Sequence, residues 1–175
     1  MAIRRGTTPY RSRANTFLGL PQKPEFEQKV IEVARVTRVT AGGKKLRFRA
    51  CVAIGDGKGT LGIGVAKGSD VSLAITKAVA KAKKDLITIP VAQGTIPHLV
   101  KEKFKAARIL LKPAPSGTGI IAGGSMRVLL ELSGIQNVVG KILGSSNKIN
   151  NLKATINAFK KLKKVDKGVS TSKET

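Results

Sequence analysis

The segment whose spacing most resembles a chemical site is a glycine-rich run, residues 117–124, that leads into a predicted helix beginning near Ser125. Glycines before a helix N-terminus leave backbone N–H groups exposed, and such groups can cradle a phosphate. A P-loop requires Gly-Lys-Ser/Thr at the helix entry, but here Gly124 is followed directly by Ser125. A dinucleotide fingerprint needs an immediately preceding strand and an acidic residue about 20 positions later, whereas here prolines intervene and Glu131 comes early. The run alone therefore does not identify a nucleotide site.

This run is also similar to the phosphate loop of the galactokinase and homoserine kinase superfamily, which would imply a small-molecule kinase. No accompanying set of catalytic carboxylates is recognisable among the ten Asp and Glu residues. His98 is the only histidine, and it has neither a GxSxG elbow nor a placed Cys partner. Cys51 is expected to be a small buried filler, and Asp56, between two glycines, a turn residue. We therefore expect no enzyme activity, no metal and no cofactor.

The charge of the chain points to a different chemistry. Thirty-three Lys and Arg residues against ten Asp and Glu give a formal net charge of +23 over 175 residues, spread through segments that look folded. Such a field costs the compact state self-repulsion unless a polyanion neutralises it, and the phosphate backbone is the obvious candidate. Aromatic residues are only 3%, so stacking platforms for splayed bases are few. This favours recognition of a duplex or of backbone shape.

The elements that must position these cations begin with a predicted hairpin. Val30 to Thr40 is rich in Val, Ile and Thr, and residues 41–44 (AGGK) signal a tight reversal. On the return strand, side chains alternate between faces, so Lys45, Arg47 and Arg49 share the face opposite an aliphatic one. Gly62 and Gly64 on the following strand, like the turn glycines, would allow close backbone approach. The predicted phosphate-binding and sugar-binding residues are Arg35, Arg38, Gly42, Gly43, Lys44, Lys45, Arg47, Arg49, Lys58 and Lys67.

A helix is predicted next, with Ser69 as N-cap and apolar positions at helical spacing from Val71 to Leu86. Its opposite side carries Lys77, Lys81 and Lys84. A solvated lysine face is the ordinary interpretation, but the neighbouring basic sheet favours a shared binding surface.

The remainder predicts a second unit of strands and helices. Short strands are expected around residues 96–100, at 107–112 ending at Pro113, and at 137–143. Helices are expected from about Ser125 to Ser133, terminated by Gly134, and over residues 147–164. The predicted domains are a basic arm (1–24), a β-β-β-α domain (25–92), a β-α-β-rich domain (93–165) and a disordered tail (166–175). No apolar run is long enough to span a bilayer, and the arm fits either nucleic-acid binding, which we favour, or an organellar transit peptide.

Three blocks carry a specific resemblance: residues 35–67 (RVTRVTAGGKKLRFRACVAIGDGKGTLGIGVAK), 117–127 (GTGIIAGGSMR) and 144–155 (GSSNKINNLKAT). Over about residues 25 to 160 the chain resembles bacterial-type small-subunit ribosomal protein five. The resemblance implies an α+β fold, with an N-terminal double-stranded-RNA-binding-like β-β-β-α domain followed by a small β-α-β-rich second domain. It also implies a ribosome in a bacterial cytoplasm or in an organelle such as a plastid.

The same resemblance implies contacts with small-subunit ribosomal RNA and with ribosomal proteins four and eight, in a structural role that supports assembly and translational accuracy. The family's hairpin loop, matching residues 38–47, reaches RNA near the head and neck of the subunit, and spectinomycin resistance arises there. The family's interface with protein four maps onto the second block, which makes Gly119, Gly124 and Arg127 candidates for a protein contact. The alternatives are a general DNA-compacting protein, which would need only charge, and the small-molecule kinase.

Overall fold

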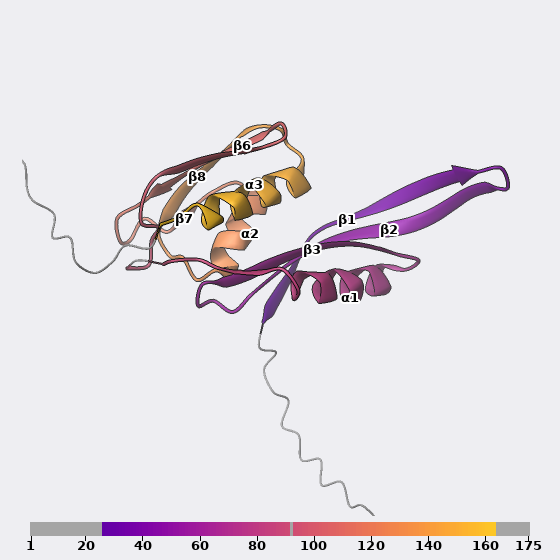
Figure 1. The fold of residues 1–175 in the computed structure, drawn as a ribbon, viewed down its shortest axis with the longest axis horizontal. Coiled ribbons are helices and arrows are strands. Elements are labelled where there is room, and N and C mark those ends of the chain that lie inside the picture. The colour runs from indigo at the N-terminus through magenta and orange to yellow at the C-terminus, as the bar shows by residue number, and fades with distance from the viewer. Residues whose placement is uncertain (1–25, 92, 164–175) are drawn as a thin grey trace, which may run out of the picture.

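The computed structural model describes residues 26–91 and 93–163, which form two four-stranded sheets and three helices (Figure 1). The predicted arm at 1–24 and tail at 166–175 lie outside the described residues. The first sheet carries a helix in β-β-β-α order, and the second encloses a β-α-β unit. The predicted α+β class is therefore confirmed.

The first sheet is an antiparallel meander in the order β1-β2-β3-β4. Its strands are β1 (Glu27–Thr40), β2 (Gly43–Gly55), β3 (Thr60–Gly68) and β4 (Leu86–Thr88). The predicted hairpin turns over two residues, Ala41 and Gly42, because Thr40 pairs with Gly43. This turn sets the register of every cationic position on the two long strands.

Helix α1 (Val71–Ala82) follows β3, and two details of its prediction are wrong. The residue at the N-cap is Asp70 instead of Ser69, and its side chain makes no capping hydrogen bond. The helix ends at Ala82 because the chain turns there, and Leu86 pairs with Gly62 as the first residue of β4. Edge pairing with β3 thus outweighs the helical spacing of Leu86.

The second sheet has the order β5-β6-β8-β7, with β7 parallel to β8 and the other pairs antiparallel. Its strands are β5 (Val100–Phe104), β6 (Ala107–Pro113), β7 (Ile120–Ile121) and β8 (Val138–Gly144). Helix α2 (Gly124–Leu132) connects β7 to β8, and α3 (Lys148–Lys160) follows β8. The sequence correctly predicted β6, α2 and β8 but missed the two-residue β7, which is too short to show a periodicity.

Two further boundaries differ from the prediction. The strand expected around residues 96–100 begins only at Val100, because Ile96 is buried outside the sheet, in the approach to it. Helix α3 ends at Lys160 with Lys161 at the C-cap, so Lys163 lies beyond the last turn, and the predicted end at Lys164 lies outside the described residues.

Both faces of β2 are covered along its second half. Ala50, Val52 and Ile54 pack against α1, while Cys51 and Ala53 join a larger core shared with the second sheet. Leu61 from β3 and Leu132 from α2 belong to the same shared core. The two sheets are therefore parts of one packed structure.

Candidate nucleic-acid interface

The hairpin of β1 and β2 projects beyond the rest of the first sheet (Figure 1). Strand β3 ends at Gly68, opposite Phe48, so residues 43–47 of β2 pair only with β1. We call this two-stranded part, residues 36–47, the ribbon. A ribbon without a third strand gains little from packing, so it leaves both faces open to a partner.

One face of this ribbon gathers cations around a groove of about 480 Å³. Arg38 pairs with Lys45 across the strands, Arg47 lies two residues further along the same face, and Lys67 of β3 closes the inner end. The groove is lined by Val36, Thr37, Arg38, Thr40, Lys45, Arg47 and Lys67. Four predicted RNA-binding residues thus lie around one concave surface that contains no carboxylate.

The tip of the ribbon is almost bare backbone. A Cβ placed on Gly42 or Gly43 would meet no atom within 4 Å, and Gly43 adopts a φ of +118°. The Thr40 hydroxyl donates to the Gly43 carbonyl at 3.1 Å and closes the turn. A large partner can therefore approach the backbone at the tip closely, as predicted for this pair of glycines.

Four other predicted residues lie elsewhere. Arg35 pairs with Phe48 and Lys44 with Val39, and both cations belong to the opposite face of the β1–β2 hairpin. Lys58 lies in the turn between β2 and β3, at the far end of β2 from the tip. Arg49 shares the groove face, but its guanidinium lies 3.7 Å from the Glu32 carboxylate, with one third of its side chain exposed. The ten predicted residues therefore do not form one surface.

The glycines of β3 have a different use from the one predicted. A Cβ at Gly64 would overlap the carbonyl oxygen of Ala78, and one at Gly62 would lie 2.6 Å from the carbonyl oxygen of Ala82. The partner that approaches these glycines is helix α1, so neither residue is available to RNA. The expectation that they admit an outside backbone is wrong.

The glycine-rich run before α2 is closed by its own chain. The Asn137 side-chain oxygen accepts the N–H groups of Gly117 at 3.0 Å and Gly119 at 3.1 Å, and the Gly119 carbonyl accepts the N–H of Val138. These amides are therefore already satisfied and do not face a phosphate. The sequence did not signal Asn137, because its contacts join residues 18 and 20 positions apart.

The three predicted protein-contact residues surround the start of α2. Gly119 lies in the closed run, whereas Gly124 is the first residue of α2 and has no atom within 4 Å of a Cβ position. Arg127 donates to the Ile120 carbonyl at 2.9 Å and lies 3.9 Å from Glu131, yet more than half of its side chain remains exposed. Two of the three thus present a surface, and Gly119 shapes the loop beneath it.

The remaining residues that could take part in chemistry, Cys51, His98 and Asp56, are in positions that support the fold. Burial raises the pKa of the Cys51 thiol to about 11, so little reactive thiolate forms near neutral pH. His98 accepts the N–H of Lys163 through Nε2 at 3.2 Å, which ties the end of α3 to the approach to β5. Asp56 accepts two backbone N–H groups within its own turn. Among residues 26–91 and 93–163, no cluster of three His, Cys, Asp or Glu side chains is suited to a metal.

The groove includes three residues that the sequence did not single out: Val36, Thr37 and Thr40. The two-residue turn could have predicted them, because it fixes the pairing of the two strands. Counting back from the turn along both strands places Val36 opposite Arg47. No helix within the described parts of the chain is long and apolar enough to cross a membrane.

Comparison with known proteins shows which family the chain is similar to. Residues 26–90 match the family model for the N-terminal domain of ribosomal protein S5, and residues 102–172 match the model for its C-terminal domain. A small ribosomal subunit protein uS5 from Thermotoga neapolitana is 52% identical over 141 residues, covering 81% of this chain and 79% of the relative.

Two relatives named uS5c are also similar to this chain. The one from Cyanidium caldarium is 50% identical, and the match covers 81% of this chain and 84% of the relative. The one from Emiliania huxleyi is 45% identical, and the match covers 86% of this chain and 96% of the relative. The family is structural and non-enzymatic, which removes the kinase alternative. The chain belongs to the ribosomal protein S5 family.

Proposed function

We propose that this protein is held in the small ribosomal subunit by its ribbon, whose basic groove binds the phosphate backbone of small-subunit ribosomal RNA. Membership of the family makes the chain a structural protein of that subunit, in a bacterium or an organelle. The observation that carries the RNA contact is the groove itself. Arg38, Lys45, Arg47 and Lys67 line one concave face of a hairpin that has no other packing partner.

Arginine and lysine have complementary parts in this groove. A guanidinium can hold a phosphate through two parallel hydrogen bonds, while an ammonium acts as a point charge. Such contacts fix the position and register of the protein on RNA without reading its bases. The bare glycine tip extends the same contact, because RNA backbone can approach it without meeting side chains.

The start of α2 is proposed as a protein-binding surface, with Gly124 and Arg127 exposed and Gly119 shaping the loop. Ribosomal proteins four and eight are the proposed neighbours, as the family resemblance implies. RNA on one side and proteins on the other would let the chain support subunit assembly and translational accuracy.

Sedimentation tests the proposal. We expect the full chain to co-migrate with small subunits at moderate salt and an Arg47→Glu variant to lose at least about tenfold in occupancy, because one phosphate contact becomes a repulsion. The matched control is Lys112→Glu, which introduces the same negative charge at an exposed position of β6, outside the groove. Equal occupancy of all three proteins would overturn the assignment of the groove. Equal affinity of the wild-type protein for random duplex DNA and for the RNA would instead favour general nucleic-acid compaction.

A further inference from the structure

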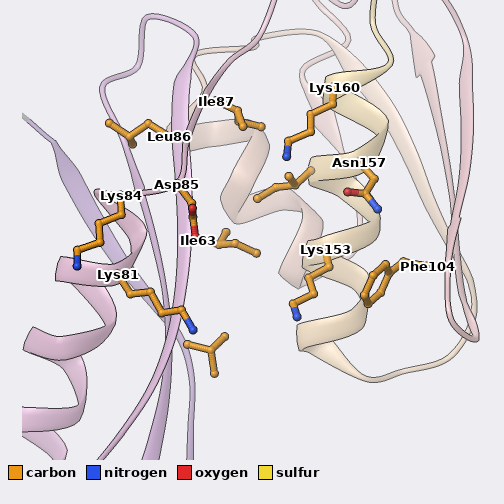
Figure 2. A pocket seen from close by; sticks show the side chains of 12 residues that line it. Ile63, Lys81, Lys84, Asp85, Leu86, Ile87, Phe104, Lys153, Asn157 and Lys160 are labelled. Atoms are coloured by element: carbon orange, nitrogen blue, oxygen red, sulfur yellow. The ribbon is translucent and has the colours of Figure 1, made fainter.

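A second basic concavity lies between the two halves of the molecule, away from the ribbon. It is a cleft of about 640 Å³, and its floor is aliphatic, formed by side chains such as Ile63, Val65 and Ile87 from the first sheet. Figure 2 shows Lys81, from α1, on one wall and Lys153 and Lys160, from α3, on the other. The ammonium groups of these three lysines extend into the gap (Figure 2).

These two lysines of α3 are exposed on a helix that is otherwise mostly buried. Lys153, Asn157 and Lys160 follow the i, i+4, i+7 spacing of one helix face, whereas most of the other residues between Asn151 and Phe159 are buried. The Cα atoms of the two lysines are seven residues apart, which is about 10 Å along the helix axis. The Lys153 ammonium also lies over the Phe104 ring, 5.6 Å from its centre, which orients it within the cleft.

Charge within the cleft is not balanced by the protein. Lys84 lies at the rim, and the one carboxylate among the lining residues is that of Asp85. Within residues 26–91 and 93–163, the ion pairs present involve none of these four lysines. Gathering four cations around an apolar floor costs repulsion that an anionic partner would relieve.

We infer that this cleft between α1 and α3 binds a strand of RNA through its phosphate backbone. Lysine binds phosphate as a point charge, so the four ammonium groups that line the cleft suit successive phosphates of a backbone. The aliphatic floor accommodates the sugars between phosphates. This inference rests on the proposed function and adds a second contact to it, one that joins the two halves of the chain.

Salt dependence of binding tests the inference. The variant is Lys81→Gln/Lys153→Gln/Lys160→Gln in the full chain, and the probe is full-length small-subunit ribosomal RNA. Each lost phosphate contact reduces the slope of log affinity against log salt by about 0.7 to 0.9, so the triple variant should lose about 2 in slope and bind about tenfold or more weakly. The matched control is Lys112→Gln/Lys141→Gln/Lys148→Gln, which removes three exposed lysines that do not line the cleft.

A second measurement locates the occupant. An iron chelate attached to an Asn157→Cys variant in reconstituted small subunits should cut the RNA within a few nucleotides of one site; the native Cys51 is buried and will not compete. Equal slopes for cleft and control variants, or cleavage of a neighbouring protein instead of RNA from this position, would overturn the inference. If the cleft variant binds RNA normally while Arg47→Glu loses binding, only the inference about the cleft is wrong. If both bind normally, the proposed function fails as well.

Discussion

At the residue scale, Asp56 shows how one carboxylate specifies a turn. Its Oδ1 accepts the N–H of Lys58 at 2.7 Å and of Thr60 at 2.9 Å. Partial burial raises the pKa of Asp56, but these backbone hydrogen bonds outweigh burial and the pKa is lowered overall. The ionised form is therefore favoured by the folded state, and its contribution to stability is greatest above the usual carboxyl range.

We expect Asp56→Ala to lower the free energy of unfolding by about 1.5 kcal/mol at pH 7, the lower end for charged hydrogen bonds, because water can replace the acceptor in this accessible turn. A carboxyl whose folded-state pKa is lowered stabilises above its unfolded pKa and loses that effect as the pH falls through the folded value. Urea unfolding at pH 7 and at pH values below 3.8 checks this. A difference that persists undiminished at the acidic end would contradict the role of the charge.

Arg49 and Arg47 differ although both lie on the groove face. Arg49 faces Glu32 at 3.7 Å, so reversing its charge would place two carboxylates together and disturb folding as well as binding. Arg47 has no such neighbour among the described ion pairs. The effect of Arg47→Glu on RNA should therefore appear without a change in melting temperature, which a thermal denaturation of the free protein measures.

At the element scale, the close packing of α1 on β3 depends on missing side chains. Ala74, Ala78 and Ala82 face the sheet, and Gly62, Gly64 and Gly68 lie where a Cβ would meet the helix backbone. The helix can therefore lie against the strand itself, which explains why small residues recur on both elements.

Gly64→Ala should destabilise the protein by about 3 kcal/mol or more, because the new methyl group overlaps the Ala78 carbonyl and backbone cannot move aside cheaply. Gly42→Ala is the matched control, since a Cβ there meets nothing within 4 Å. Chemical denaturation of both variants gives the comparison. Equal stabilities would mean that α1 packs less closely than described.

At the scale of the whole molecule, the two sheets meet along a seam at the end of α2. The N–H of Gly57 donates to the Leu132 carbonyl at 3.0 Å, and Lys29 pairs with Glu131 at 2.9 Å. Gly134 adopts a φ of +77°, and a Cβ there would overlap the Gly57 carbonyl. A single core runs through this seam, although the predicted division near residue 92 stays a prediction.

We expect the two halves to unfold in one cooperative transition, because burying Cys51 and Ala53 requires both. Gly134→Ala should lower protection from hydrogen exchange equally in β2 and β6, even though it lies in neither strand. Native-state exchange of the Ala53 and Ile109 amides measures this. Protection of β6 that survives the loss of protection in β2 would show two independent domains.

The net charge of +23 also acts at this scale. Counting one phosphate contact for each of the four groove cations and for each of Lys81, Lys153 and Lys160 in the cleft, log affinity for RNA should fall against log salt with a slope of about −5 to −6, from about 0.7 to 0.9 per phosphate. Titration at several salt concentrations measures the slope. A flat dependence would exclude phosphate contacts as the source of affinity.

The sequence by itself determined the local helices and strands and the sign of the partner's charge. Alternation predicted the hairpin and placed Lys45, Arg47 and Arg49 on one face, helical spacing predicted α2, and the charge demanded a polyanion. These properties follow from periods of two and 3.6 residues, which are visible within a short stretch of chain. The family blocks then identified the ribosomal relatives.

The tertiary structure decided which parts of those patterns stay exposed. The face of β2 that carries Arg47 at one end is buried at Cys51 and Ala53, because the second half of the chain packs there. Likewise, Gly62 and Gly64 meet α1 instead of RNA, and Lys81 meets Lys153 and Lys160 across a cleft. Periodicity states which side chains share a face, but only packing between distant segments determines what covers that face.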